Sequence, residues 1–274
     1  MKVGIIGDGL WGTALGKLAR RGGHELVINS GIDTASDAAL QFKDMDIWLV
    51  AVPGKFFRAG TARFKSAYNK QPIIICSKGI EPDTYKTMAE ILVDLFPASK
   101  NKIGVLSGPQ FADEVASGLK TGSLIAGSGP VLKVARELFA EFYLEESGDV
   151  IGAEIAGAGK NAVSLVFGYY KFRAAGRNEV ALMISRAWSE VINIGQALGG
   201  RGETFAGLAG VGDLFLSAAN GGGRNYAAGV AIARREPIVG TVEGIDAIKG
   251  LVNIAAAHKI GVPVLSAMAK LLPR

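Results

Sequence analysis

A lysine set among small residues is the strongest candidate for chemistry in this sequence. Residues 154–161 read Glu-Ile-Ala-Gly-Ala-Gly-Lys-Asn, in a stretch that we expect to be helical, and no acidic residue adjoins Lys160. Lysine usually occupies a solvated helix face, and this is the simpler interpretation of Lys160. The alternative is a general acid or base, which would need burial and a nearby like charge to lower its pKa from about 10.4 to roughly 7 to 8.

A glycine-rich turn near the N-terminus predicts a site for a dinucleotide. Residues 2–6 form a β-rich run, residues 7–12 read Gly-Asp-Gly-Leu-Trp-Gly, and residues 13–20 carry apolar side chains at helical spacing. The glycines let the backbone approach a pyrophosphate, which then lies at the positive end of the helix. The strand before the turn and the helix after it are the context that this motif requires.

Apolar strands alternate with helical stretches as far as about residue 150. We expect strands at 25–28, 47–52, 73–76 and 103–106, and helices at 57–68 and 84–95. This alternation predicts a parallel sheet with right-handed crossovers, in which ligands bind outside the carboxyl ends of the strands. Three loops are expected at those ends, at 52–54, 77–79 and 107–110. Lys78 lies in the second loop, although a turn lysine pointing to water is the simpler interpretation of it alone.

The second half of the chain predicts helices. Clear strand signals stop near Gly152, and we expect helices at 153–172, 179–198, 211–219, 225–234, 244–258 and 265–272. The predicted fold class is α/β: an N-terminal Rossmann-like, doubly wound parallel sheet followed by an all-helical C-terminal domain. We expect residues 1–151 to bind the dinucleotide and residues 152–274 to bind the substrate.

Composition and charge argue against several classes of protein. The 274 residues are 49% hydrophobic, and we find neither an apolar run long enough to cross a bilayer nor a signal peptide. The net charge of +5 is modest and scattered, which disfavours nucleic acid and suits small anionic ligands. We expect the single Cys76 to pack in the core, and with only His24 and His258 we expect no metal site. A cytoplasmic enzyme or binding protein is the expectation.

Motifs in both halves resemble one family, the NAD(P)-dependent glycerol-3-phosphate dehydrogenases of the bacterial type. In the family's order they are GDGLWGTAL at 7–15, SKG at 77–79, SGPQFADEVA at 107–116, EIAGAGKN at 154–161, GLAGVGDL at 207–214, GRN at 223–225 and VEG at 242–244. The resemblance implies a fold similar to that of 6-phosphogluconate dehydrogenase. It also implies an oxidoreductase that interconverts sn-glycerol 3-phosphate and dihydroxyacetone phosphate, supplies phospholipid synthesis, and forms a homodimer through its helical half.

The resemblance also implies roles for individual residues. Lys160 matches the family's catalytic lysine, Lys78 its substrate-orienting lysine and Asp213 its active-site aspartate. Substrate contacts are implied for Lys78, Gly108, Gln110, Ser217, Gly223, and the phosphate-binding pair Arg224 and Asn225. Dinucleotide contacts are implied for Gly7, Gly9, Leu10, Trp11, Gly12, Asn29, Ser30, Lys78, Ala112, Arg224, Thr241 and Glu243. Gly157 and Gly159, which cost helix stability of about 1 kcal/mol each, could let cofactor and substrate approach Lys160.

Several positions depart from the family's pattern. Ser217 stands where a threonine is usual, Gly223 stands where a serine is usual, and the connection after Asn29 is short. Asn29 and Ser30 include neither the acid that often marks an NAD site nor the arginine that often marks an NADP site. Asp33 lies at about the right distance for the acid but is at least as well interpreted as a helix N-cap. We expect NADP or NAD, with a mild preference for NADP.

Two other functions remain open on the sequence. A related two-domain reductase of a 2-hydroxy acid or ketoacid would need a carboxylate-binding group in place of Arg224 and Asn225. A non-catalytic NAD(P)-sensing protein would need the nucleotide turn but not Lys160, Lys78 and Asp213 together. The protonation state of Lys160 also remains open, because Lys78 would lower its pKa and Asp213 would raise it.

Overall fold

The chain divides into two compact units. The computed structural model describes residues 1–30, 40–219 and 223–273. The first unit comprises Met1–Ser77 and Met88–Val150, and the second comprises Lys78–Thr87 and Ile151–Arg274. The short segment Lys78–Thr87 was expected with the sheet, but its contacts place it in the second unit.

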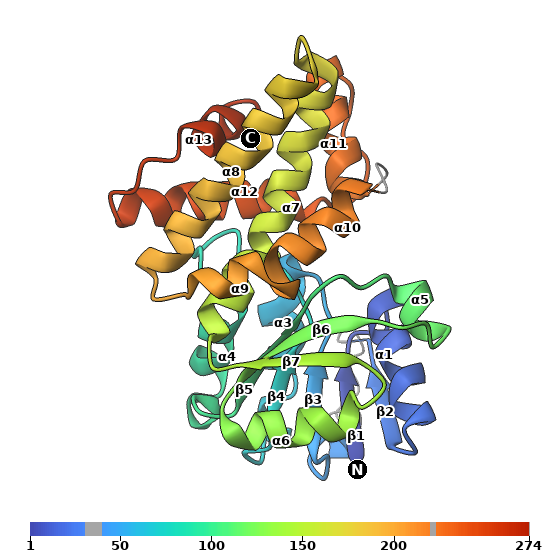
Figure 1. Ribbon diagram of the computed structural model, residues 1–274. Coiled ribbons are helices and arrows are strands. Elements are labelled where there is room, and N and C mark those ends of the chain that lie inside the picture. Colours follow the sequence, from blue (N-terminus) through green and yellow to red (C-terminus); the bar gives the residue numbers. More distant parts are fainter. Residues whose placement is uncertain (31–39, 220–222, 274) are drawn as a thin grey trace. The chain divides into compact units, whose positions relative to one another are not determined.

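The first unit is built on a twisted sheet, which has seven strands in the part of the chain that the structure describes (Figure 1). The strands are β1 (Lys2–Ile6), β2 (Glu25–Asn29), β3 (Ile47–Val50), β4 (Ile73–Ile75), β5 (Ile103–Ser107), β6 (Gly122–Gly127) and β7 (Tyr143–Ser147). Their order in the sheet is β2-β1-β3-β4-β5-β6-β7. All neighbouring pairs are parallel except β5 and β6, which are antiparallel. The predicted Rossmann-like fold class is thus confirmed.

The order of strands explains where a ligand can bind. The chain adds β2 on one side of β1 and β3 on the other, so the direction of strand addition reverses at β1. Such a reversal opens a crevice at the carboxyl ends of the strands, where doubly wound sheets bind their ligands. The glycine turn leaves β1 at this end and leads directly into helix α1 (Leu10–Arg21).

Helices and short 3₁₀ turns connect the strands. They are η1 (Gly54–Phe56), α3 (Phe57–Ala62), η2 (Lys65–Ala67), α4 (Met88–Leu95), η3 (Pro97–Ser99), α5 (Ala112–Ala116) and α6 (Gly129–Leu138). Apolar side chains of α1 and α6 pack with the central strands into one buried cluster, which includes Leu15, Leu49, Ile125 and Phe139. Cys76 lies in the same cluster, 3% exposed, so the prediction that it packs in the core is confirmed.

Three details of the first unit differ from the sequence prediction. Strands β6 and β7 were not predicted: glycines flank the apolar part of β6, and β7 reads Tyr-Leu-Glu-Glu-Ser, which hides the alternation of a strand. The helix expected at 57–68 is interrupted after Ala62 and ends in a 3₁₀ turn. The helix expected at 84–95 begins only at Met88, because residues 78–87 have a structure of their own.

Apart from the segment Lys78–Thr87, the regular secondary structure in the described part of the second unit is helical. Its elements are α7 (Val150–Arg173), α8 (Arg177–Ala197), α9 (Gly202–Ala206), the π-helix η4 (Leu208–Gly212), α10 (Asp213–Ala219), α11 (Arg224–Arg234), α12 (Glu243–Ala257) and α13 (Pro263–Ala269). Helix α7 runs through this unit, and the other helices surround it (Figure 1).

Helix α7 is apolar because it is the core of its unit. We expected no apolar run of membrane-spanning length, yet α7 is long and apolar enough by length and composition, the only such helix within the described residues. Its most apolar window is 78% buried inside the unit. Fifteen of its residues are buried. A helix that is apolar on all sides and packed by other helices needs no bilayer to account for its composition.

A buried carboxylate fastens the last helix to this bundle. Glu190 of α8 is 6% exposed, and its two oxygens accept hydrogen bonds from the backbone N–H groups of Val264 and Leu265, at 2.8 and 2.9 Å. These donors belong to the first turn of α13 and have no partner inside that helix. Burial raises the pKa of Glu190 above its usual value, while the two backbone donors act in the opposite direction.

Candidate active site

Glycine is explained by a different structural feature at each of the three positions of the N-terminal turn. Gly7 has a φ of 112°, and a Cβ there would lie 2.6 Å from the carbonyl oxygen of Ala51. A Cβ on Gly12 would run into the carbonyl group of Gly7. Gly7 is therefore required for the turn to pass the end of β3, and Gly12 for the first turn of α1 to pack against Gly7. A Cβ on Gly9, in contrast, would meet nothing within 4 Å.

The open space at Gly9 fits the close approach of a pyrophosphate. Gly9 is the N-cap of α1, and no side chain caps that helix. The first N–H groups of α1 are consequently available to an anion, which the helix dipole also favours. The residues present thus fit a dinucleotide, because the protein itself leaves unfilled the one position of the turn where the ligand would lie.

The neighbouring residues predicted to contact the dinucleotide lie around this turn. Leu10 is 87% exposed at the first position of α1. Trp11 donates a hydrogen bond from Nε1 to the carbonyl oxygen of Cys76, at 3.0 Å, which ties α1 to the end of β4. Asn29 ends β2, and its carbonyl oxygen accepts a hydrogen bond from the N–H of Gly7 at 2.7 Å. Ser30 follows, and Asp33 lies outside the described residues.

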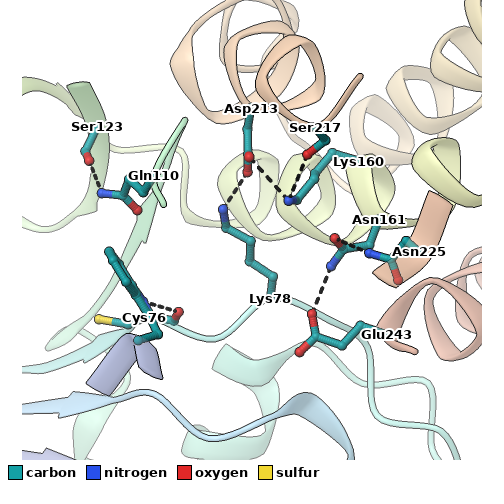
Figure 2. Close-up of polar contacts among 11 residues, drawn as sticks. Cys76, Lys78, Gln110, Ser123, Lys160, Asn161, Asp213, Ser217, Asn225 and Glu243 are labelled. Atoms are coloured by element: carbon teal, nitrogen blue, oxygen red, sulfur yellow. Dashed lines mark hydrogen bonds and ion pairs between the residues drawn. The ribbon is translucent and has the colours of Figure 1, made fainter. Parts of the chain in front are cut away.

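The loop after β5 is held by contacts within the first unit. Gly108 has a φ of 155°, and a Cβ there would lie 3.0 Å from Cα of Ser123 in β6. Gln110 donates a hydrogen bond from Nε2 to the hydroxyl of Ser123 (Figure 2). The amide group of Gln110, predicted to contact the substrate, is thus turned to β6. Ala112 is the first residue of α5 and packs against the core of the unit.

Two lysines share one buried carboxylate in the second unit. Asp213 is 2% exposed; its Oδ2 lies 2.5 Å from Nζ of Lys78, and its Oδ1 lies 3.3 Å from Nζ of Lys160. Figure 2 shows Asp213 between the two ammonium groups. Lys160 also donates a hydrogen bond to the hydroxyl of Ser217, at 3.2 Å. Four predicted site residues from distant parts of the sequence are therefore brought together, and we call them the Asp213 cluster.

The environment of Lys160 lowers its pKa. Burial among the helices is the largest cause, since it penalises the charged form, and the like charge of Lys78 acts in the same direction. The carboxylate of Asp213 opposes both effects by stabilising the ammonium form. The net direction is downward, which settles the balance that the sequence left open. An amine with a depressed pKa is better suited to exchange a proton near neutral pH.

Local structure positions each member of this cluster. Lys160 projects from the middle of α7, and Asp213 begins α10 directly after the π-helix η4. Single turns of π-helix are rare and are often found at functional sites. Gly159 has a simpler role than expected: a Cβ there would collide with the side chain of Val191 in α8. The glycine before Lys160 therefore serves the packing of α7 on α8.

A chain of amide hydrogen bonds starts beside Lys160. Asn161, 3% exposed, donates from Nδ2 to Oε2 of Glu243 at 3.1 Å. Its Oδ1 accepts from Nδ2 of Asn225 at 2.8 Å (Figure 2). Oδ1 of Asn225 in turn accepts from the N–H of Gly244 at 2.9 Å. Burial raises the pKa of Glu243, while the positive charges of Lys160, Arg224 and Lys78 oppose this.

This series of hydrogen bonds changes the expected roles of Asn225 and Asn161. The amide of Asn225 is committed at both ends, so only its second N–H remains for a ligand. Asn161 was not singled out from the sequence, although it stands directly after Lys160. The signal that could have found it is a polar side chain within an otherwise apolar helix, because such a side chain needs a partner when buried.

The remaining predicted residues of the second unit lie at helix starts. Gly223 is the N-cap of α11, and Arg224 is its first residue; both are exposed. A Cβ on Gly223 would meet nothing within 4 Å. Thr241, also exposed, precedes Val242, the N-cap of α12. Arg224 thus combines its own charge with the positive end of an 11-residue helix, an arrangement that suits an anion.

Among the described residues, no group of three or more histidine, cysteine, aspartate or glutamate side chains could hold a metal ion. His24 lies near the N-terminus, with Nδ1 3.4 Å from the terminal amine, and His258 follows the end of α12. The charged groups of the Asp213 cluster are lysines and a single carboxylate. Any positive charge that this cluster offers a ligand comes from its two lysines.

A Rossmann-like sheet followed by a helical unit is the architecture of two-domain nicotinamide-dependent dehydrogenases. Comparison with known families agrees with it. The family model described as NAD-dependent glycerol-3-phosphate dehydrogenase N-terminus matches residues 24–130, and the corresponding C-terminus model matches residues 149–274. The chain belongs to the family of NAD-dependent glycerol-3-phosphate dehydrogenases.

Individual relatives cover nearly the whole chain. A glycerol-3-phosphate dehydrogenase [NAD(P)+] from Brucella ovis is 30% identical over 303 residues, covering 99% of this chain and 92% of the relative. The enzyme of that name from Bradyrhizobium sp. is 33% identical, covering 98% and 91%. The crystal structure of glycerol-3-phosphate dehydrogenase from Coxiella burnetii has a TM-score of 0.85 at 24% identity, covering 99% of this chain and 94% of that one. A ketopantoate reductase from Ralstonia eutropha has a TM-score of 0.61 at 17% identity and shares the fold.

Proposed function

We propose that this chain interconverts sn-glycerol 3-phosphate and dihydroxyacetone phosphate, with NAD(P) as the hydride carrier. The observation that carries the proposal is the Asp213 cluster, in which two lysines share a carboxylate that is 2% exposed. Membership of the glycerol-3-phosphate dehydrogenase family supports the same substrate pair.

Lys160 is the acid for ketone reduction and the base for alcohol oxidation. A bound nicotinamide would supply the hydride to the substrate's C2 or accept it from there. Reduction builds negative charge on the C2 oxygen. The ammonium group of Lys160 stabilises that charge and then donates a proton to the oxygen. Its lowered pKa makes it a stronger acid than an exposed lysine, and equally makes the neutral base easier to form.

Lys78 and Asp213 prepare Lys160 for this role. Lys78 orients the substrate oxygen and adds the positive charge that lowers the pKa of Lys160. Asp213 holds both ammonium groups in place through its two oxygens. Ser217 accepts a hydrogen bond from Lys160 and so fixes the direction of its Nζ. The hydroxyl at this position therefore suffices even though the family usually has a threonine there.

The substrate phosphate binds at the start of α11. Arg224 supplies a planar fork that can hold two phosphate oxygens, and Gly223 lets the backbone approach them. Asn225 adds the one N–H that its bonds to Asn161 and Gly244 leave available. Asn161 acts as a positioning residue, since it fixes the amide of Asn225 while lying next to Lys160 in α7. Gly108 and Gln110 provide further substrate contacts.

The dinucleotide binds to residues 1–151, with its pyrophosphate at the glycine turn. Gly7, Gly9 and Gly12 shape the turn, and Gly9 leaves the space that a phosphate would fill. Further contacts come from Leu10, Trp11, Asn29, Ser30, Lys78, Ala112, Arg224, Thr241 and Glu243. We expect a mild preference for NADP over NAD, because Asn29 and Ser30 offer no carboxylate to a ribose 2′-hydroxyl. The substrate chemistry belongs to residues 152–274 together with Lys78.

The cellular setting follows from the same proposal. An enzyme of this kind in the cytoplasm would supply glycerol 3-phosphate for phospholipid synthesis. It would work as a homodimer formed through its helical unit, on a small phosphorylated substrate, without nucleic acid and without insertion into a membrane.

Steady-state kinetics with both cofactors test the proposal. We expect oxidation of NADPH, and more slowly of NADH, with dihydroxyacetone phosphate. Unphosphorylated dihydroxyacetone should have a kcat/KM lower by at least about 100-fold, since charge-assisted hydrogen bonds are each worth about 1.5–3 kcal/mol. Oxidation of neither cofactor with dihydroxyacetone phosphate would refute the proposal. Equal rates with both ketones would remove the phosphate site from it.

A further inference from the structure

Lys78 belongs to a small closed segment of the second unit. The chain reaches it directly from β4 through Ser77, yet Lys78–Thr87 forms its contacts with the helices. An antiparallel bridge between Ile80 and Thr87 closes the segment, and the N–H of Glu81 donates to the carbonyl of Lys86 at 2.9 Å. Lys78 is therefore joined to a folded loop that begins two residues after it.

The loop is seated on helix α12 through Ile80. The Ile80 side chain is 1% exposed. It packs on Gly250: a Cβ on Gly250 would lie 2.5 Å from Cγ2 and 2.9 Å from Cβ of Ile80. Real Cβ atoms do not approach other atoms so closely, and the Cβ of Ile80 is fixed to the backbone. An added methyl group at Gly250 would therefore have to move the loop itself.

Gly79 joins this seat to Lys78. Its φ is 149°, a conformation that side chains rarely adopt, and it leaves one residue between Lys78 and Ile80. At the other end of the Lys78 side chain, Nζ lies 2.5 Å from Oδ2 of Asp213. The position of Lys78 is thus defined at two points of the same unit, by Asp213 at its tip and by Ile80 at its backbone.

We propose that Ile80 and Gly250 are positioning residues for Lys78. The glycine in α12 provides the space in which Ile80 is seated, and that seat keeps the Lys78 ammonium group on Asp213. The inference rests on the proposed function, because it gives Lys78 its catalytic use, but the seat itself is a property of the second unit.

The first test is Gly250→Ala. Alanine has a higher helix propensity than glycine, so without the contact to Ile80 this change would stabilise α12. We expect instead that kcat for dihydroxyacetone phosphate falls about 10- to 100-fold, as small misplacements of catalytic groups do. The KM for NADPH should change by a smaller factor than kcat, since the glycine turn is untouched and Lys78 is only one of the proposed dinucleotide contacts. Gly202→Ala is the matched control, because the nearest atom to its Cβ would be the flexible amide end of Gln196 at 3.4 Å.

A pH profile separates positioning from general damage. When Lys78 leaves Asp213, Lys160 loses a like charge and gains a larger share of the carboxylate. Asp213 and Glu243 are the carboxylates that act on Lys160, and both raise its pKa. The kinetic pKa of glycerol 3-phosphate oxidation should therefore shift upward in Gly250→Ala. Mere destabilisation of the fold would lower the amount of active protein without moving this pKa.

The double variant Ile80→Ala/Gly250→Ala tests the contact itself. Ile80→Ala alone removes the anchor and should lower kcat, and the methyl group added to α12 by Gly250→Ala should then occupy part of the vacated space. We expect the double variant to be more active than the product of the two single effects predicts. If Gly250→Ala does not fold, Ile80→Ala alone tests the proposal. A lower kcat with a raised kinetic pKa in Ile80→Ala supports it, and unchanged values of both overturn it.

Amide hydrogen exchange gives a reading that is independent of activity. In Gly250→Ala the peptides that cover residues 79–87 should exchange about tenfold faster than in the unmodified protein, while α7 is unaffected. Wild-type protein that is inactive on dihydroxyacetone phosphate would refute the proposed function. The exchange result would still show whether Gly250 holds Ile80 and its loop in place. Unaltered exchange and a kcat within twofold of wild type in Gly250→Ala would overturn the inference.

Discussion

Replacing Asp213 by asparagine should lower the kinetic pKa of Lys160. Asparagine keeps the size and one acceptor oxygen of aspartate but removes the negative charge that the two ammonium groups share. At 3.3 Å and an effective dielectric constant of about 20, the attraction between Oδ1 and Nζ of Lys160 is about 5 kcal/mol. Water reaches 16% of the Lys160 side chain and screens part of this attraction, but enough remains that its loss should lower the pKa of Lys160.

The sign of the pH effect follows from the two forms of Lys160. Oxidation of glycerol 3-phosphate needs the neutral amine, so its rate rises as the pH passes the pKa of Lys160. In Asp213→Asn this rise should move to lower pH, because the carboxylate that stabilises the ammonium form is gone. Reduction needs the ammonium form, so its rate near neutral pH should fall in the variant.

The assay is the pH dependence of the isolated chemical step in both directions, measured by rapid mixing for wild type and Asp213→Asn. Lys78→Met is the opposing control, because it removes a like charge and should move the same pKa upward. A thermal melt of each variant checks that the fold is retained. An unchanged or raised kinetic pKa in Asp213→Asn would refute the electrostatic account of Lys160.

Three further changes test other parts of the structure. Gly9→Ala should leave the melting temperature unchanged but raise the Kd for NADPH at least about tenfold. Gly12→Ala should instead lower the melting temperature, since there is no space for its Cβ. The reverse pattern would contradict the steric account of the turn. Arg224→Ala should raise the KM for dihydroxyacetone phosphate about 10- to 100-fold with little effect on unphosphorylated dihydroxyacetone, and an unchanged KM would place the phosphate elsewhere. Glu190→Ala should lower the free energy of unfolding in urea by about 2–4 kcal/mol, because it leaves the N–H groups of Val264 and Leu265 buried without acceptors. A loss below about 1 kcal/mol would show that water replaces the carboxylate.

The order of elements could be predicted from the sequence where periodicity is strong. The strands at 73–76 and 103–106 are apolar throughout, which is typical of strands buried on both faces. Strand β7 carries two glutamates and a tyrosine at the edge of the sheet, so its pattern is not that of a buried strand. Residues 78–87 could not be assigned, because Ile80 forms its defining contact with Gly250, which is distant in the sequence.

The candidate site shows a similar division. The sequence motifs singled out Lys78, Lys160, Asp213 and Ser217, and the structure brings them together. That one carboxylate serves both lysines could not be read from the sequence, since Lys78 and Asp213 are 135 residues apart. The lowered pKa of Lys160 depends on burial by several helices, which no local pattern encodes. Asn161 was missed for the same reason, because its partners Asn225 and Glu243 belong to other helices.

The most direct test of the central claim is the single-turnover rate of dihydroxyacetone phosphate reduction in Lys160→Met, with NADPH already bound. Methionine keeps the length and apolar stem of lysine but has neither charge nor proton to give. The account predicts a fall on the order of 10²- to 10⁴-fold with an unchanged Kd for NADPH. A rate within about fivefold of wild type would contradict the assignment of Lys160 as the proton donor.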